Sequence, residues 1–403
     1  MSGSVVDTIT FGCRLNIVES EALAGEARGA GEENLVIVNT CAVTAESTRQ
    51  ARQAIRRLHR ERPDVRIIVT GCAATIAPTE FLAMEGVTRV VGNGDKSLFA
   101  PAGPSFAAPK ALGASEGTRG FLAVQNGCDH RCAFCVIPFG RGPSRSAPPR
   151  EIVARARELV ASGKREIVLT GVDLTSYGGD LDGGETLGRL ARLLLAELPE
   201  LARLRISSID CIEADPTLIE AIAEEPRLAP HLHLSLQSGD DLILKRMKRR
   251  HSRRDAIKFC EELRLLRPDI VFGADFIVGF PTETEEMFSR TLDLVEECGL
   301  THLHVFPFSL RPQTPAARMP QVAPQIVKAR AQRLRALGEA RLARHLAKQQ
   351  GKVLRVLAER GGFARAADFT LARTPGAIAG AVFDIRVSGH DGRALLTAQM
   401  EQR

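Results

Sequence analysis

The stretch NGCDHRCAFCVIPF, residues 126–139, places three cysteines within eight positions. They are Cys128, Cys132 and Cys135, and Gly127 directly precedes them, so the backbone can fold closely around a bulky inorganic group. Clustered thiolates select zinc or an iron–sulfur cluster, and a closed structural site of either kind requires four ligands. Three ligands therefore predict an iron–sulfur cluster with one open iron, where a cofactor or substrate can coordinate.

Zinc is the alternative occupant of this motif, with His130 as the fourth ligand. His130 lies between two of the cysteines, where the geometry of the imidazole ring makes joint chelation awkward. This geometry favours the iron–sulfur interpretation.

The composition is that of a large cytosolic protein. The chain has 403 residues, 44% of them hydrophobic, which predicts two or three domains. It contains no run of eighteen apolar residues and no basic and apolar leader, so we expect cytoplasmic localisation and no membrane partner. Nine cysteines are too few for a disulfide scaffold of this size, which favours metal or catalytic roles. The net charge of +6 is compatible with a nucleic-acid partner.

Three further cysteines end three β-rich runs near the N-terminus. VVDTITFGC, NLVIVNTC and VRIIVTGC end at Cys13, Cys41 and Cys72, with intervals of 28 and 31 residues that suit one βα unit each. The pattern predicts a doubly wound α/β domain over residues 1–100, in which loops at the carboxyl ends of neighbouring strands converge. Single buried cysteines would be ordinary packing residues. Their recurrence at one structural position instead favours a shared three-thiolate site.

Residues 101–117 are rich in Pro, Ala and Gly and are predicted to be a linker. From residue 118 to 345, six strand-like runs alternate with helical patterns, which predicts an α/β fold in the form of a partial (β/α)6 barrel with its chemistry at the carboxyl ends of the strands. The runs lie at 121–125, 166–171, 204–209, 231–236, 271–280 and 302–308. Residues 346–403 show alternating apolar residues and glycine breaks, typical of a small antiparallel β-barrel.

The string CDHRCAFC, residues 128–135, matches the CxxxCxxC signature of radical S-adenosylmethionine (SAM) enzymes, and it follows the first predicted barrel strand as that family requires. The resemblance implies that the open iron of a 4Fe-4S cluster binds the amino and carboxylate groups of SAM. It also implies that an electron from the cluster breaks the sulfonium bond and yields a 5′-deoxyadenosyl radical, while the protein supplies orientation and a dry cavity.

Nearly the whole chain resembles the radical SAM methylthiotransferases, whose last module is a TRAM nucleic-acid-binding domain. In that family the cysteines corresponding to Cys13, Cys41 and Cys72 hold a second 4Fe-4S cluster, and its free iron carries the sulfur to be transferred. The resemblance therefore implies two 4Fe-4S clusters, SAM, and a TRAM-like C-terminal domain.

The strings NTCAVT and FPFSLRPQTPAA look most like the branch that methylthiolates carbon 2 of N6-threonylcarbamoyladenosine next to the anticodon of tRNA. This resemblance implies tRNA as substrate and an electron-donor protein of the flavodoxin or ferredoxin type as partner. The alternatives are the sister branches, which act on isopentenyladenosine in tRNA or on an aspartate of a ribosomal protein. A zinc-dependent RNA-binding module without catalysis is an alternative from another class.

Several more residues are candidate contacts. No general base is evident from the sequence. The predicted strand ends carry candidate SAM contacts, although each also has an ordinary role as a turn or cap residue; they are Gly171, Ser235, Gln237, Ser238 and Gly279. Arg141 and Arg145 are expected to contact anions of substrate or cofactor. The basic run at 245–254 is expected to bind tRNA phosphates. The strand histidines are expected to be hydrogen-bonded barrel residues rather than ligands; they are His231, His233, His302 and His304.

Overall fold

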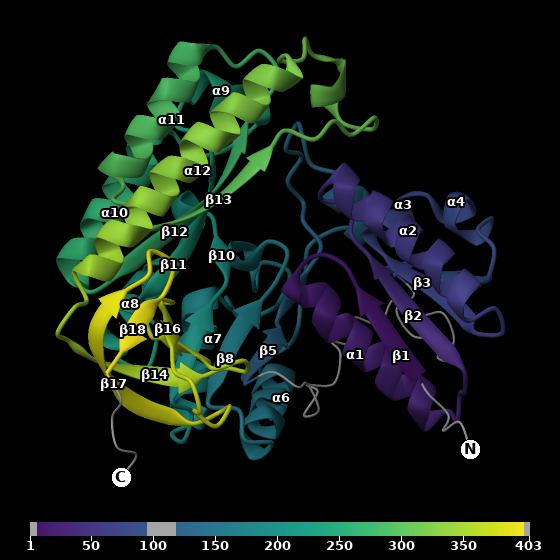
Figure 1. The fold of residues 1–403 in the computed structure, drawn as a ribbon, viewed down its shortest axis with the longest axis horizontal. Helices are drawn as coiled ribbons and strands as arrows, with labels where there is room; N and C mark the ends of the chain where they lie inside the picture. The colour runs from purple at the N-terminus through teal and green to yellow at the C-terminus, as the bar shows by residue number, and fades with distance from the viewer. Residues whose placement is uncertain (1–5, 95–117, 399–403) are drawn as a thin grey trace.

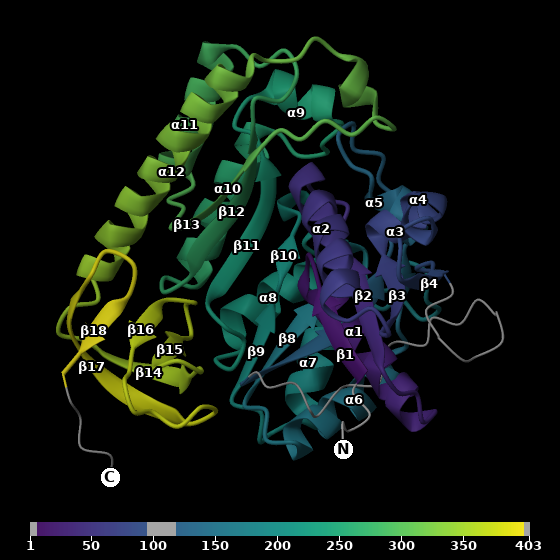
Figure 2. The same ribbon diagram turned by 45° about the vertical axis from the view of Figure 1, so that its right-hand side comes forward.

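A computed structural model of the chain describes residues 6–94 and 118–398. Figures 1 and 2 show three bodies: an N-terminal α/β unit, a larger half-open barrel, and a small closed barrel near the C-terminus. Within the described ranges, no helix combines the length and the apolarity needed to span a bilayer.

The N-terminal unit contains β1 (Val6–Thr10), α1 (Arg14–Gly29), β2 (Leu35–Thr40), α2 (Ala45–Glu61), β3 (Arg66–Gly71), α3 (Cys72–Ile76), α4 (Pro78–Leu82) and β4 (Val87–Val91). Its four strands are parallel and lie in the order β1–β2–β3–β4. Alternate residues of β2 point to opposite faces of the sheet. Leu35 and Ile37 join a core that includes side chains of α1. Val36 and Val38 join a separate core that includes side chains of α2, so both faces are covered.

The central unit is built on parallel strands that follow the predicted βα repeat, with the third predicted strand divided in two. Its strands are β5 (Arg119–Ala123), β8 (Glu166–Thr170), β9 (Arg203–Ile206), β10 (Ser208–Ile209), β11 (His231–Gln237), β12 (Val271–Val278) and β13 (His302–Pro307), with the short antiparallel pair β6 (Gln125–Asn126) and β7 (Arg145–Ser146). They pair as β5–β8–β9 and as β10–β11–β12–β13. In the described part of the chain β5 and β13 do not pair, so the barrel is open on that side.

Helices cover the outer side of this curved sheet. They are α6 (Pro149–Ala161), α7 (Leu187–Glu197), α8 (Pro216–Glu224), α9 (Asp241–Met247), α10 (Arg253–Leu266), α11 (Glu285–Glu297) and α12 (Pro324–Ala347), with 3-10 turns at η1 (Leu174–Ser176), η2 (Cys211–Glu213) and η3 (Pro315–Arg318). The short helix α5 (Ile137–Arg141) instead packs against α3 of the N-terminal unit. The main hydrophobic core lies between these helices and the outward side chains of the strands. Cys211, Cys260 and Cys298 are buried in that core, which fits packing roles.

The C-terminal unit is a closed barrel of β14 (Val353–Ala358), β15 (Phe363–Ala366), β16 (Leu371–Arg373), β17 (Val382–His390) and β18 (Leu395–Thr397). Figure 1 shows α12 running along the central unit and leading into this barrel. Phe369, in the loop between β15 and β16, stacks on His231 of β11 with ring centroids 4.9 Å apart. The small barrel is therefore docked against the amino-terminal end of the central strands.

The architecture confirms the predicted fold class of a doubly wound N-terminal unit, a partial barrel and a small C-terminal β-barrel. The predicted linker at 101–117 lies outside the described residues. The predicted domain limit after residue 345 falls two residues before the end of α12 at Ala347.

Candidate functional site

Cys13, Cys41 and Cys72 lie at the carboxyl ends of the strands of the N-terminal sheet. Each follows the carboxyl end of a strand, and the parallel register places these ends side by side. Gly12 has a φ of +101°, and a Cβ at this position would lie 2.8 Å from the sulfur of Cys41. Only glycine therefore allows the loop that carries Cys13 to approach Cys41 this closely. Cys41 and Cys72 are buried and Cys13 is exposed.

Polar groups contact the sulfurs of this set. The backbone N–H of Val43 donates to Sγ of Cys41 at 3.4 Å, and Nδ2 of Asn93 donates to Sγ of Cys72 at 3.6 Å. Burial raises the pKa of the Cys41 thiol, and the neighbouring Cys72 and Cys13 raise it further. A free thiolate is disfavoured there, whereas a bound metal centre holds its ligand thiols deprotonated.

The second set, Cys128, Cys132 and Cys135, lies on the loop between β6 and α5. Gly127 has a φ of +77°, and a side chain there would collide with the carbonyl oxygen of Pro143. The loop is fixed by the backbone bond from Cys128 N–H to the oxygen of Gly142, at 3.1 Å. Ile137 N–H donates to Sγ of Cys135 at 3.4 Å. Burial, with the neighbouring Cys132 and Cys72, raises the pKa of the Cys135 thiol to about 11.

His130 does not complete a set of four ligands with these cysteines. Its Nε2 lies 2.8 Å from Oδ2 of Asp173, and Sγ of Cys128 lies 3.5 Å from the same oxygen. Potential ligand atoms of Cys128, His130 and Asp173 lie within 4.8 Å of one another, but this group does not include Cys132 or Cys135. The described residues thus do not form the three-thiol, one-imidazole zinc site.

The two sets of thiols are neighbours, because α3 packs directly against α5. A Cβ on Gly140 of α5 would lie 3.1 Å from Cβ of Cys72, the first residue of α3. Asn93 bridges the same helices, since its Nδ2 donates both to Sγ of Cys72 and to the carbonyl oxygen of Gly140. A group held by one set therefore lies beside a group held by the other.

Arg141 has partners different from those expected from the sequence. Its side chain is buried, and Nη1 lies 2.8 Å from Oε1 of Glu19 and 2.9 Å from Oδ1 of Asn126. Nη2 donates to Oδ1 of Asn16. The guanidinium of Arg141 already has protein partners, and its expected contact with an anion of substrate or cofactor stays a prediction. Arg145 lies half-buried on β7, and its expected anion contact stays a prediction.

Comparison with known proteins identifies the family. Residues 122–295 match the radical SAM superfamily, and residues 6–92 match an uncharacterized protein family, UPF0004. The threonylcarbamoyladenosine tRNA methylthiotransferase MtaB of Rickettsia prowazekii is 46% identical over 90% of this chain and 90% of its own. The chain belongs to the radical SAM methylthiotransferases.

Further matches agree with this family. The tRNA-2-methylthio-N(6)-dimethylallyladenosine synthase of a Jannaschia species is 38% identical, over 81% of this chain and 78% of its own. Among solved structures, the radical SAM methyltransferase TsrM of Kitasatospora setae aligns with a TM-score of 0.60 at 15% identity. That alignment covers 77% of this chain and 76% of TsrM. This last similarity concerns the fold alone.

The cofactors of a radical SAM methylthiotransferase are SAM and two 4Fe-4S clusters, and the donor sets in this chain fit them. Each set supplies three thiols, and in each set a backbone N–H already points at one sulfur, as is usual around cluster sulfurs. Free cysteines are present at all six positions. Three thiols leave one iron of a 4Fe-4S cluster without a protein sulfur in each set.

The predicted SAM contacts occupy turns at the carboxyl ends of three strands. After β8, a Cβ on Gly171 would lie 2.9 Å from Oε1 of Gln125. After β12, Gly279 has a φ of +72° and its N–H donates to Oε2 of Glu283 at 2.9 Å. At the end of β11, Gln237 has a φ of +67°. These positions, with Ser235, stay predicted contacts.

Ser238 has a local role at the start of α9. Its hydroxyl accepts the backbone N–H of Asp240 at 3.2 Å, and its side chain is buried. This is the turn role that the sequence left open as the alternative, and the N-cap of α9 is Asp240, whose Oδ1 accepts the N–H of Ile243.

The basic run at 245–254 is largely paired inside the protein. Arg249 lies 2.6 Å from Asp210, and Arg250 lies 2.7 Å from Glu213. Arg253 pairs with Glu297 at 2.5 Å. These three arginines pair with acids that are distant in sequence, and the expectation that the run serves tRNA phosphates stays a prediction.

Three residues touch the thiols through contacts that the sequence does not predict. Asn93 contacts Cys72, Asp173 contacts Cys128, and Nη1 of Arg249 lies 3.8 Å from Sγ of Cys132. None is close to its cysteine in the sequence, so only the tertiary contacts reveal them. The expectation of satisfied barrel histidines is also wrong for His231, since neither ring nitrogen has a hydrogen-bond partner among the described residues.

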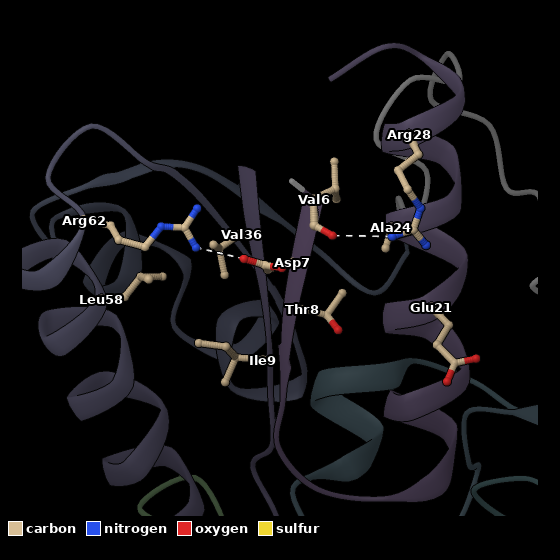
Figure 3. Close-up of a pocket in the computed structure, with 10 residues that line it drawn as sticks. All are labelled: Val6, Asp7, Thr8, Ile9, Glu21, Ala24, Arg28, Val36, Leu58 and Arg62. Carbon is tan, nitrogen blue, oxygen red and sulfur yellow. Dashed lines mark hydrogen bonds and ion pairs between the residues drawn. The ribbon is translucent and has the colours of Figure 1, made fainter. Parts of the chain in front are cut away.

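A hollow of about 600 Å³ lies along the edge strand β1, between α1 and α2 (Figure 3). Its wall carries an ion pair of 2.8 Å between Arg62 and Asp7 and a bond from Arg28 to the carbonyl oxygen of Val6. None of the six cysteines lines it. It is a separate feature from the thiol sites.

Proposed function

We propose that this protein is a tRNA methylthiotransferase that adds a methylthio group to carbon 2 of N6-threonylcarbamoyladenosine next to the anticodon. The observation that carries the proposal is the pair of adjacent three-thiol sites, in a chain 46% identical to a threonylcarbamoyladenosine tRNA methylthiotransferase. Since tRNA serves translation in the cytoplasm, we propose that the enzyme acts there.

Each thiol set has a distinct role in this proposal. Cys128, Cys132 and Cys135 hold the cluster that binds SAM, and Cys13, Cys41 and Cys72 hold the cluster that carries sulfur. When bound, these groups supply the radical chemistry and the methylthio group. The packing of α3 against α5 keeps the two centres beside one another, so that one substrate base can reach both.

The protein's own residues orient and shield these centres. Cys41 and Cys72 are buried and Cys128, Cys132 and Cys135 are partly buried, which limits the access of water to the sulfurs. Asn93 and Arg249 place N–H groups against sulfur, which stabilises negative charge there. The turns at Gly171, Gln237 and Gly279 form a wall at the strand ends, and we propose that SAM lies against them with Ser235.

An electron must reach the SAM-binding cluster from outside the chain. We propose a small protein of the flavodoxin or ferredoxin type as the donor, because such proteins carry one electron at low potential.

The second candidate is methylthiolation of isopentenyladenosine, which the 38% identical Jannaschia relative supports. Mass spectrometry of tRNA nucleosides from a deletion strain separates the two. We expect loss of methylthio-threonylcarbamoyladenosine, with its precursor retained. An unchanged level of that nucleoside, with loss of the isopentenyl derivative, would favour the second candidate.

A ribosomal-protein substrate and a zinc RNA-binding module can each be tested directly. A ribosomal-protein substrate would leave both tRNA nucleosides unchanged in the deletion strain. A zinc RNA-binding module would retain zinc and show no cluster absorbance after anaerobic reconstitution, whereas we expect about eight irons per chain from two 4Fe-4S clusters.

A further inference from the structure

Three polar side chains meet on the inner face of the central barrel. His233 lies on β11, Asp275 on β12 and His304 on β13, and β12 pairs with both of the neighbouring strands. Nε2 of His233 lies 2.9 Å from Oδ1 of Asp275, and Nδ1 of His304 lies 3.1 Å from the same oxygen. The two imidazole rings are 4.4 Å apart between centroids. We call this group the lumen triad.

The strand alternation fixes which way the lumen triad points. Leu232 and Leu234 of β11 belong to the core under the helices, so His233 between them faces inward. Ala274 and Phe276 flank Asp275 in the same way. The triad is therefore part of the barrel interior.

The triad lies inside the barrel, near the carboxyl ends of the strands, where the loop that carries the second thiol set is found. Ser235 is two residues closer than His233 to the carboxyl end of β11, on the same face, which corresponds to about 7 Å along the strand. Nη2 of Arg249 donates to the carbonyl oxygen of Ser235 at 2.7 Å, and Nη1 of the same side chain lies 3.8 Å from Sγ of Cys132. The side chain of Arg249 thus connects the carboxyl-terminal part of β11 with Cys132, a predicted cluster ligand.

His304 is the accessible member of the triad. Its side chain is 59% exposed, compared with 10% for His233 and 21% for Asp275. It lies on β13, the strand at the open side of the barrel, next to the partly exposed Phe306. A molecule that enters the barrel from this side meets His304.

Asp275 orients both rings. Burial alone would raise the pKa of its carboxyl, but the hydrogen bonds from His233 and His304 hold that pKa well below its usual range. An ionised carboxylate only accepts hydrogen bonds. Nδ1 of His304 therefore carries a hydrogen and donates a hydrogen bond to Oδ1 of Asp275. Nε2 of His304 then points away from Asp275 and has no partner among the described residues.

We infer that the lumen triad is the subsite for the polar N6 substituent of the substrate adenosine, with Nε2 of His304 as its contact. This inference rests on the proposed function. A threonylcarbamoyl group offers a urea, a hydroxyl and a carboxylate. Nε2 accepts from a urea N–H or the hydroxyl when the ring is neutral, and donates to the carboxylate when the ring carries a second proton.

The same site discriminates against an isopentenyl group. A branched alkenyl substituent has no hydrogen-bonding atom, so it would desolvate His304 without replacing the lost bonds to water. Sites that hydrogen-bond a substrate reject analogues that lack the polar group, because their own polar atoms are left unpaired. The triad therefore favours the threonylcarbamoyl substrate over the isopentenyl one.

A bound metal ion is a second kind of occupant that two imidazoles and a carboxylate suggest. The nitrogen-to-oxygen separations of 2.9 and 3.1 Å are those of direct hydrogen bonds, which satisfy Asp275 without an ion. The triad is therefore better explained as a hydrogen-bonded unit.

The test uses the full chain with both clusters loaded and three anticodon stem–loop RNAs, which carry threonylcarbamoyladenosine, isopentenyladenosine or plain adenosine. His304→Phe keeps a flat ring and removes the nitrogens. We expect it to weaken binding of the threonylcarbamoyl RNA by about 10- to 100-fold, with less than about a threefold change for the adenosine RNA. Asp275→Asn, which removes the charge that orients both rings, is expected to give the same selective loss. His59→Phe, on α2 of the N-terminal unit, serves as the matched control and is expected to preserve the preference.

Several outcomes would overturn the inference. If the wild-type enzyme prefers the threonylcarbamoyl RNA and both triad variants keep that preference, the subsite is elsewhere and the proposed function stands. If the wild-type enzyme prefers isopentenyl RNA, the proposed substrate and the subsite fail together. Zinc binding to the cluster-loaded enzyme that His304→Phe abolishes would make the triad a metal site instead. Iron content and thermal unfolding of each variant establish that it is folded.

Discussion

Arg141 and Glu19 form a buried ion pair between the central barrel and the N-terminal unit, with 2.8 Å between Nη1 and Oε1. Their side chains are 1% and 5% exposed. Arg141 ends α5, which follows the second thiol set, whereas Glu19 lies on α1, which begins directly after Cys13. Asn16 extends the connection, because its Oδ1 accepts from both Arg141 and the thiol of Cys13. The pair therefore fixes one thiol set relative to the other.

Replacement of Arg141 by Lys is expected to uncouple the two centres. Lysine keeps the charge but cannot reach Glu19, Asn126 and Asn16 at once, since it lacks the planar fork of donors. A shift of about 1 Å between reacting groups can cost about 100-fold in rate. We expect methylthio product to fall by at least about tenfold while SAM cleavage continues, so the ratio of 5′-deoxyadenosine to product rises.

The control for this prediction is Arg157→Lys. Arg157 pairs with Glu197 on the exposed surface, where an ion pair contributes little. Parallel loss of SAM cleavage and product in Arg141→Lys, at unchanged ratio, would show that the pair supports the fold rather than the alignment of the centres.

Cys132→Ala and Cys41→Ala are expected to separate the two activities. Loss of Cys132 removes a ligand of the SAM-binding cluster, so SAM cleavage should be abolished. Loss of Cys41 affects the sulfur-carrying cluster, so cleavage should persist while methylthiolation stops. Iron analysis should give about four irons per chain in each variant, half the content of two 4Fe-4S clusters. Cys260→Ala, in the packed core, is the control that should retain the full iron content.

Equal loss of SAM cleavage in both cluster variants would contradict two separate sites. Because Cys135 and Cys72 lie close enough to influence one another's charge, some loss of the neighbouring cluster is the main competing explanation. Electron paramagnetic resonance of each reduced variant tests this explanation. A variant that keeps the neighbouring cluster gives the signal of one cluster, whereas a variant that has lost both clusters gives none.

The positions of the six cysteines could be predicted because they depend on local pattern. A run such as NLVIVNTC fixes a buried strand and places its final cysteine at the carboxyl edge, and parallel pairing then brings Cys41 beside Cys72. The barrel followed from the same βα periodicity. These features need only the sequence spacing and the geometry of parallel sheets.

The partners of charged residues could not be predicted in this way. Arg141 stands in a basic GRGPSR string, and its partner Glu19 is 122 residues away on another unit. Arg249 likewise meets Asp210 only through the packing of two βα units. The lumen triad has the same origin, because its members are 42 and 29 residues apart and a histidine on a strand has no local signal for what lies across the sheet.

Phe369 is expected to stabilise the docking of the C-terminal barrel. Its ring stacks on His231, and the guanidinium carbons of Arg365 and Arg205 lie 4.3 and 5.0 Å from its centroid. Phe369→Ala should reduce the free energy of unfolding by about 3 kcal/mol, from lost packing and cation–π contacts. Phe369 has a φ of +74°, which is strained for any residue except glycine. Phe369→Gly should therefore be about 1 kcal/mol more stable than Phe369→Ala.

Urea unfolding and hydrogen exchange in β14–β18 would measure these changes. Ile378→Ala is the control, because Ile378 is 75% exposed in the same unit and its loss should change stability by less than about 0.5 kcal/mol. Identical stabilities for wild type and Phe369→Ala would show that Phe369 does not contribute to the docking of the C-terminal barrel.

Asp368 is expected to make the same interface sensitive to acid. Its Oδ2 lies 3.1 Å from Nε2 of His345 on α12, and Oδ1 accepts the N–H of Thr370 at 3.0 Å. Burial alone would raise the pKa of this carboxyl, but the hydrogen bonds and charge of these partners lower it to about 2. A carboxyl whose pKa is lower in the folded state contributes stability above its unfolded pKa, near 4, and loses it as the pH falls toward 2.

Asp368→Asn should therefore cost roughly 2 kcal/mol at pH 7, where the wild-type carboxylate is ionised in both states. The difference between variant and wild type should shrink as the pH falls from about 4 to about 2, because protonation makes the wild-type side chain resemble the amide. Urea unfolding of cluster-free protein across that range measures both changes, since acid would release iron from the loaded enzyme. Asp384→Asn, on β17, is the matched control within the same barrel. A difference that stays constant down to pH 2 would show that Asp368 acts through shape rather than through its charge.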